Sequence, residues 1–300
     1  MYHNPVMLTE CLEGLKINPK GTYLDLTFGG GGHSCAILEQ LDGGKLYSFD
    51  QDDDAVKNAD SINNPSFNLI EANFRDVAKY LRLYGVTQVD GVLADLGVSS
   101  HQFDEVDRGF SFRGDAPLDM RMNQSFGKTA SEVLNQYTEK DLHYIFGVYG
   151  EVRNAKTLAA LIVKHRVNEP FKTTFQFVEV LRTVSPRGKE VKYFAQVFQA
   201  LRLEVNAELS ALEEMLMQMN DLISEGGRLV VMSYHSLEDR LVKNFINKGV
   251  FKGEPEKDLY GNTDNKFKSI TRKPIIPMEE EIAENNRARS AKLRIAERVK

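Results

Sequence analysis

The sequence predicts an α/β protein in which a parallel sheet, covered by helices on both faces, is interrupted by a helical insertion. Short apolar runs alternate with helix-like stretches over the first hundred residues. Four consecutive glycines follow the first apolar run, and helical patterns then fill a further hundred residues before strand signals return near residue 226. This order is typical of βαβ units that carry an insertion.

The first hundred residues contain four predicted strands. They lie at 22–28, 45–49, 67–70 and 89–96, with helix-like stretches at 34–41, 53–59 and 74–84 between them. The strands read as nearly continuous apolar runs rather than as alternating patterns. Such runs indicate strands buried on both faces, as in a parallel sheet.

The second hundred residues are predominantly helical. Helical patterns occur at 130–137, 139–147, 153–166, 174–184 and 192–202. An amphipathic helix follows, with apolar residues spaced by four and three, and should pack on the sheet. Its stripe comprises Val205, Leu209, Leu212, Leu216, Met219 and Ile223. The sheet then resumes at 226–234, with a helix at 236–248 and strands near 268–271 and 291–297. We therefore predict a sheet domain at 1–107 and 209–300, and a helical domain at 108–208.

Composition excludes several protein classes. The chain has 300 residues, of which 42% are hydrophobic and 27% charged, with a mean hydropathy of −0.37. No apolar run reaches the roughly 20 residues of a membrane helix, and the first residues lack the pattern of a signal peptide. Cys11 and Cys35 provide neither a disulfide framework nor a CxxC metal site, so we expect a cytoplasmic protein without a metal.

Charge is distributed unevenly along the chain. The net charge is −5, but residues 1–110 contain 8 basic and 17 acidic side chains. Residues 111–210 contain 14 basic and 11 acidic side chains, and residues 272–300 contain 8 and 5. An acidic first third and two basic later segments weakly indicate a division between two binding surfaces.

The glycine run at 29–32 predicts a ligand-binding loop. It lies between a strand and a helix, where backbone N–H groups can approach a ligand closely. A dinucleotide fingerprint that starts at Gly29 needs glycine at position 34, which is Ser34, and no phosphate-loop pattern occurs. The loop therefore argues against an NAD-dependent oxidoreductase, which stays a distant alternative.

Three carboxylates lie in or at the ends of predicted strands, and they should meet in one crevice. Asp25 lies in the first strand, Asp50 ends the second and Asp95 ends the fourth. An acidic residue at position 50 can accept both hydroxyls of a ribose. Several carboxylates suit a sulfonium and an ammonium better than two phosphates, which favours S-adenosylmethionine (SAM). Phe74 could cover an adenine. The alternatives are that Phe74 only packs in the core and that Asp50 is only a solvated residue of an acidic run.

Asp95 is the candidate catalytic residue. A carboxylate that accepts one N–H of an exocyclic amine raises the nucleophilicity of that amine, whose lone pair is otherwise delocalised. Aligning the amine with the methyl group would provide most of the acceleration. The alternative is that Asp95 only caps the following loop.

Several motifs, taken in order, resemble the RsmH (MraW) family of SAM-dependent methyltransferases, which act on a cytosine N4 of 16S ribosomal RNA. The matching stretches are HNPVMLTE at 3–10, GGGGHS at 29–34, DGVLADLGVSSHQ at 90–102, RGFSF at 108–112, PLDMRM at 117–122, YGEVR at 149–153, FQALR at 198–202, SYHSLEDR at 233–240 and RARSAKLR at 287–294. The sequence departs from the family pattern at a few positions. Tyr234 stands where the family usually has phenylalanine, Asn286 replaces a proline and Asn123 an aspartate, and Gln196 stands where an arginine is usual.

The resemblance implies a class I methyltransferase fold and a set of SAM contacts. The family's cofactor residues fall on Gly31, Gly32, His33, Asp50, Phe74, Asp95 and Gln102. It also implies that the helical insertion and the basic C-terminal motif help to hold RNA of the small ribosomal subunit. Our candidate RNA contacts are Arg121, His235, Arg287 and Arg289, each of which a structural role explains as well.

Two further alternatives stay open beside a 16S rRNA cytosine-N4 methyltransferase. One is an amino-methyltransferase that acts on DNA, although such enzymes usually carry an Asp/Asn-Pro-Pro-Tyr/Phe motif where this chain has Asp95-Leu-Gly-Val. The other is a non-catalytic ribosome-assembly factor, which would have no need of a complete cofactor set. The sequence leaves the oligomeric state open, with a homodimer as one hypothesis.

Overall fold

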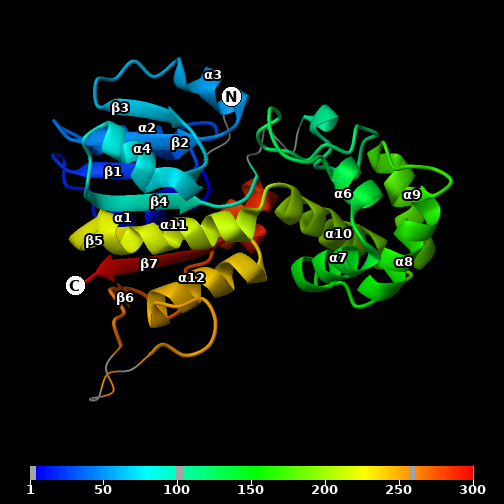
Figure 1. Cartoon of the computed structure of the whole chain (residues 1–300). Helices are drawn as coiled ribbons and strands as arrows, with labels where there is room; N and C mark the ends of the chain where they lie inside the picture. Colours follow the sequence, from blue (N-terminus) through cyan, green and yellow to red (C-terminus); the bar gives the residue numbers. More distant parts are fainter. Residues whose placement is uncertain (1–4, 99–104, 257, 259–260, 262, 300) are drawn as a thin grey trace. The chain divides into compact units, whose positions relative to one another are not determined.

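The computed structural model describes residues 5–98, 105–256, 258, 261 and 263–299, and it divides the chain into two compact units (Figure 1). The sheet unit comprises residues 1–97 and 209–300, and the helical unit comprises residues 98–208. No helix in the part of the chain that the structure describes is long and apolar enough to cross a bilayer.

The sheet unit is built on one seven-stranded sheet with the order β3-β2-β1-β4-β5-β7-β6. Strands β1 to β5 are parallel, as the apolar runs predict, whereas β7 is antiparallel to both of its neighbours. The bounds are β1 (Thr22–Asp25), β2 (Lys45–Asp50), β3 (Phe67–Glu71), β4 (Val89–Asp95), β5 (Ile223–Ser233), β6 (Phe267–Ser269) and β7 (Lys292–Arg298). These findings confirm the α/β class and the predicted strands to within a few residues.

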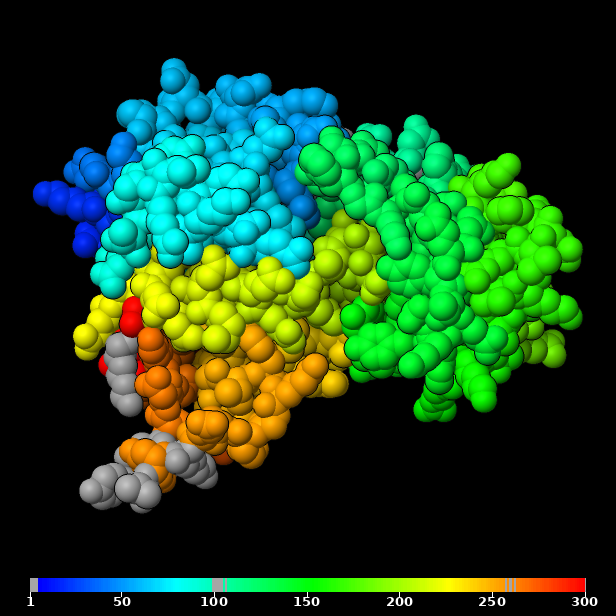
Figure 2. Space-filling view, in the orientation of Figure 1, coloured from blue at the N-terminus to red at the C-terminus, as the bar shows by residue number. Residues whose placement is uncertain are grey.

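Helices cover both faces of this sheet. Successive strand residues alternate between two cores, so that Leu24 packs with α4, α11 and α12 while Tyr23 packs with α1 and α2. Figure 1 shows α4, α11 and α12 in front of the sheet, and Figure 2 shows residues near 80 lying against α11 on that face. The bounds are α1 (Leu8–Leu15), α2 (Gly32–Gln40), α3 (Asp53–Ala59), η1 (Phe74–Asp76), α4 (Val77–Leu83), α11 (Glu208–Leu222), α12 (Ser236–Lys248), α13 (Glu279–Glu284) and η4 (Asn286–Ser290).

The helical unit has its own apolar core, which includes the fully buried rings of Phe146, Phe171 and Phe177. Capping boxes begin α6, α7 and α9, where Thr129, Thr138 and Thr173 each accept the amide of the residue three positions on. The bounds are η2 (Val106–Arg108), α6 (Ala130–Gln136), α7 (Glu139–Tyr144), the π-helical turn η3 (Ile145–Tyr149), α8 (Ala155–Arg166), α9 (Thr174–Val184) and α10 (Glu190–Val205).

The structure differs from the sequence predictions at three places. The apolar stripe from Val205 to Ile223 does not lie on one helix, because Ala207 adopts a φ of 48° and separates α10 from α11, and Ile223 begins β5. The units divide at 97/98, whereas the predicted boundary is at 107/108, and Val98 packs against the helical core. Helices α1 and α13 were not predicted.

The strand order determines where a ligand can bind. From β1 the chain runs outward through β2 to β3 on one side, and from β4 to β5 on the other, so the direction reverses between β1 and β4. Ligands of open α/β sheets bind at such a reversal, beyond the carboxyl ends of the strands. Asp25, Asp50 and Asp95 are the last residues of β1, β2 and β4, which places all three at this edge.

Candidate functional site

The glycine loop joins β1 to α2 at the carboxyl edge of the sheet. Gly31 has a φ of 79°, and a Cβ atom there would lie 2.8 Å from Cζ of Phe28. A Cβ on Gly32 would collide with the ring of Pro5. Gly31 is also the N-cap of α2 and provides no capping side chain, so the first amides of that helix are left for other partners. Both glycines are therefore required by the path of the chain, and the loop presents backbone donors.

Asp50 is tied directly to this loop. Its Oδ2 accepts the backbone N–H of Gly29 at 2.8 Å, and its Oδ1 accepts that of Asp52 at 3.0 Å. Burial raises the pKa of Asp50 to about 6, although these two hydrogen bonds act to lower it. The side chain is still partly exposed. The structure thus brings Asp50 beside the glycine loop, where a ribose contact stays a prediction.

Asp95 ends β4 one strand away from Asp25. Its backbone N–H donates to Oγ1 of Thr27 at 2.7 Å, and its Oδ1 accepts the hydroxyl of Tyr234 at 2.8 Å. Burial raises the pKa of Asp95 to about 6, and His33 and the Tyr234 hydroxyl oppose that rise. A partly exposed carboxylate with a pKa near neutrality suits general base or hydrogen-bond chemistry.

Asp25 does not reach the surface of the crevice. It is fully buried, and its Oδ2 accepts the hydroxyl of Ser34 at 2.6 Å, which in turn lies 2.8 Å from the Ser48 hydroxyl. Burial raises the pKa of Asp25. These contacts join β1, β2 and the start of α2 beneath the glycine loop. Asp25 therefore stabilises the start of α2 from the interior of the sheet unit. The prediction that Asp25 lies in the exposed crevice together with Asp50 and Asp95 is wrong, because its side chain is fully buried.

His33 and Phe74 lie at the same edge in different surroundings. His33 is 6% exposed, and its Nε2 lies 3.1 Å from the carbonyl oxygen of Val6, which links α2 to the segment before α1. Phe74 begins η1 just after β3 and is partly exposed against the core. Their cofactor contacts stay predictions. Gln102 lies outside the described residues.

The predicted RNA contacts have different environments. Arg121 belongs to the helical unit and forms a two-pronged pair with Asp119, with both N–O distances at 2.8 Å, which helps to lower the pKa of that carboxyl. Arg287 and Arg289 are exposed on η4. His235 caps α12, and its side chain is only 9% exposed. All four RNA roles stay predictions.

Sequence reasoning missed the contact between Tyr234 and Asp95. In the sequence, Tyr234 stands out only as a departure from a family motif. In the structure it follows β5 directly, and β5 is the neighbour of β4. A hydroxyl-bearing residue at the end of a strand adjacent to a catalytic candidate is the signal that could have found it. No group of three metal-ligating side chains gathers among the described residues.

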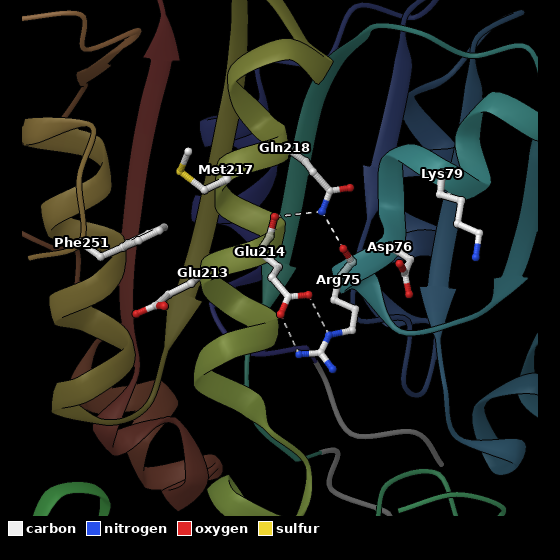
Figure 3. Close-up of a pocket in the computed structure, with 8 residues that line it drawn as sticks. All are labelled: Arg75, Asp76, Lys79, Glu213, Glu214, Met217, Gln218 and Phe251. Atoms are coloured by element: carbon white, nitrogen blue, oxygen red, sulfur yellow. Dashed lines mark hydrogen bonds and ion pairs between the residues drawn. The ribbon is translucent and has the colours of Figure 1, made fainter.

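A shallow hollow of about 550 Å³ lies elsewhere on the sheet unit, between η1, α4 and α11 (Figure 3). Several of the polar groups that line the hollow bind one another. Arg75 forms an ion pair with Glu214 at 3.1 Å, and Gln218 Nε2 donates to the Arg75 carbonyl oxygen at 2.6 Å. None of the predicted cofactor residues lines it. The hollow is best explained as a junction that connects η1 to α11.

Comparisons with known proteins match the whole chain. The profile of the MraW methylase family matches residues 1–299. The chain is 62% identical over 298 residues to Ribosomal RNA small subunit methyltransferase H of Cytophaga hutchinsonii, covering 99% of this chain and 100% of the relative. It is 54% identical over 299 residues to the protein of the same name from Flavobacterium johnsoniae, covering 99% and 98%. A solved rRNA methylase from Streptococcus thermophilus is 13% identical over 100% of this chain and 99% of its own, with a TM-score of 0.41.

Proposed function

The chain belongs to the MraW methylase family, and from this premise we propose that it methylates ribosomal RNA of the small subunit, with SAM as methyl donor and the N4 of a 16S rRNA cytidine as acceptor. The observation that carries the proposal is the 62% identity to a small-subunit rRNA methyltransferase along essentially the full length of both chains. The edge of the sheet supports it with a glycine loop and two partly exposed carboxylates. A cytoplasmic location, where small subunits are assembled, fits this role.

The residues present fit the methyl donor. When bound, SAM supplies an electrophilic methyl group on a positively charged sulfonium. Asp50 would accept the ribose hydroxyls, because its carboxylate is held by two backbone amides and remains partly exposed. Gly31 and Gly32 would present backbone N–H groups to the amino-acid end, because they lie at the start of α2 and no side chain caps that helix. Phe74 would pack against the adenine, and His33 and Gln102 complete the proposed set.

Asp95 would act on the acceptor amine. As a carboxylate it accepts one N–H of the cytosine amino group, which orients the lone pair and offsets its delocalisation into the base. It can also take the proton that the methylated amine releases. With a pKa of about 6, Asp95 is mostly ionised at neutral pH yet basic enough to receive that proton.

The helical unit and η4 would hold the RNA. Most of the helical unit falls within residues 111–210, which contain 14 basic and 11 acidic side chains. Arg121, Arg287 and Arg289 are proposed to contact phosphates, with His235 near the target base. Phosphate contacts position the RNA, whereas recognition of the base depends on contacts to its edges. A base within structured RNA must leave its stack before it is methylated. The assembled small subunit and free RNA are both candidate substrates, and the homodimer stays a hypothesis that light scattering can test.

The experiment is a methyl-transfer assay with labelled SAM. Small subunits from a strain that lacks the enzyme, free 16S rRNA and double-stranded DNA are offered separately, and the nucleosides are separated and weighed by mass spectrometry. We expect N4-methylcytidine at one position of the subunit RNA. Asp95→Asn should abolish most of the transfer while RNA binding persists.

Other outcomes would favour the alternatives. Methylation of the DNA alone would identify an amino-methyltransferase of DNA. Binding of SAM and of small subunits without transfer would identify an assembly factor. Absence of transfer to both subunits and free RNA contradicts the proposed function.

A further inference from the structure

The hydroxyl of Tyr234 is bound to the carboxylate on which the proposed chemistry depends. Tyr234 is the first residue after β5, and β5 pairs with β4 so that Met232 lies opposite Asp95. The Tyr234 hydroxyl donates to Oδ1 of Asp95 at 2.8 Å. Burial and the neighbouring Asp95 raise the pKa of Tyr234 far above its ordinary value. The phenol therefore remains a neutral donor across the whole working pH range.

The turn that carries Tyr234 is held by α12. Glu238 is 3% exposed, and its Oε2 accepts the backbone N–H of Tyr234 at 3.1 Å. Its Oε1 lies 3.0 Å from Nε2 of His235, and Nδ1 of His235 accepts the backbone N–H of Glu238 at 3.4 Å. Since these contacts immobilise the backbone on either side of the ring, little conformational freedom is left for the phenol to lose.

The phenol occupies only one oxygen of Asp95. The backbone of Asp95 is anchored by its hydrogen bond to Thr27, and Oδ1 is anchored by Tyr234. Oδ2 accepts no hydrogen bond from any residue that the structure describes. These two hydrogen bonds, one to the backbone of Asp95 and one to its Oδ1, restrict the orientation of the carboxylate. Oδ2 is left as an acceptor that points in a defined direction.

We propose that Tyr234 is a positioning residue, which holds Asp95 by Oδ1 so that Oδ2 can accept an N–H of the methyl-acceptor amine. This inference rests on the proposed function and adds a residue to it. A hydrogen bond to a carboxylate also favours the ionised form. Tyr234 therefore keeps Asp95 available as a base at a lower pH than burial alone would allow.

The other groups around Asp95 stay in place when the phenol is removed. The titratable groups that face it are His33 on α2, Asp25 on β1, Glu238 on α12 and Cys11 on α1. Tyr234→Phe removes one oxygen and leaves all of these unchanged. Because phenylalanine is the usual residue of the family motif at this position, we expect the variant to fold.

The first test measures the ionisation of Asp95 without any substrate. The full-length chain is labelled with carbon-13 at the aspartate carboxyl groups, and Asp95→Asn assigns the resonance. In Tyr234→Phe we expect the pKa of Asp95 to rise by about one unit, since a hydrogen bond to a charged group is worth that much or more. Tyr137→Phe is the matched control, because it removes a tyrosine–carboxylate hydrogen bond, to Glu204, from the helical unit.

The second test is the pH profile of methyl transfer to small subunits. For Tyr234→Phe the acid limb of kcat should move up by about one pH unit, with a loss of about twofold at pH 7 and about fivefold at pH 6, and with recovery at alkaline pH. The KM for SAM should not change. A merely structural role would lower kcat equally at every pH.

The two tests separate the inference from the function on which it rests. An unchanged pKa of Asp95 in Tyr234→Phe, or a profile that falls without shifting, overturns the positioning role even if the parent enzyme is active. A shifted pKa in a chain whose parent methylates no ribosomal RNA supports the coupling of Tyr234 to Asp95 and refutes the proposed function.

Discussion

The carboxylate of Asp95 should make the folded chain less stable at neutral pH, so that Asp95→Asn stabilises it. The pKa of Asp95 is about 6 in the folded chain, against about 3.9 in an unfolded one. The folded state thus binds more protons between these values, and stability falls as pH rises from about 4 to 6 and is constant above. A difference of two units corresponds to about 3 kcal/mol, which partial exposure of the side chain reduces to about 1–3 kcal/mol.

The assay is calorimetric unfolding of the parent and of Asp95→Asn without SAM, at several values between pH 4 and 8. Asparagine can still accept the Tyr234 hydroxyl, so the comparison isolates the charge. We expect the variant to unfold several degrees higher at neutral pH, because about 1 kcal/mol shifts Tm by roughly 2–4 °C in a unit of this size. The gap should close toward pH 4. Asp60→Asn, which changes an exposed carboxylate, is the matched control and should show no such gap.

A gap in stability that is the same at every pH would contradict this prediction, because it would mean that Asp95 titrates normally. A variant less stable than the parent at neutral pH would also refute it. In that case the hydrogen bonds to the carboxylate would outweigh its burial. The loss of methyl transfer by the same variant is a separate result and does not decide the question of stability.

Three other predictions concern binding. Asp50→Asn leaves one of the two backbone amides at this position without a carboxylate oxygen as its acceptor. It should weaken SAM binding by about 10- to 100-fold in calorimetric titration, whereas the control Asp60→Asn should not. Equal affinities of parent and Asp50→Asn would show that Asp50 does not belong to the site. Gly31 and Gly43 have similar positive φ angles, but only at Gly31 would an added Cβ atom meet a neighbour within 4 Å. Gly31→Ala should therefore weaken SAM binding by about tenfold, whereas Gly43→Ala should not. A matching loss in both variants would indicate general destabilisation. Arg289→Ala should lower RNA affinity and reduce the slope of log affinity against log salt by about 1, measured by filter binding; an unchanged slope would argue against a phosphate contact.

Much of the fold could be predicted because its signals are local. Apolar runs predicted each parallel strand, and helical patterns predicted α6 and α9, which Thr129 and Thr173 cap in the structure. Strand ends in turn placed Asp50 and Asp95 at one edge of the sheet. Helix α1 could not be predicted in this way. It is flanked by Met7 and Lys16 in the left-handed conformation, neither of which is a common capping residue, and Met7 is held by a hydrogen bond to Glu281.

Local sequence patterns are sufficient to specify a parallel sheet with a glycine loop and carboxylates near its strand ends, since periodicity and turn chemistry act over a few residues. The accessibility of those carboxylates depends on tertiary packing. The structure differs between them in this respect. It buries Asp25 beneath the loop, leaves Asp50 and Asp95 partly exposed, and brings the phenol of Tyr234 onto Asp95 across 139 positions of the chain. Burial and hydrogen bonding between distant residues depend on how β5 packs beside β4, and no local pattern encodes that packing.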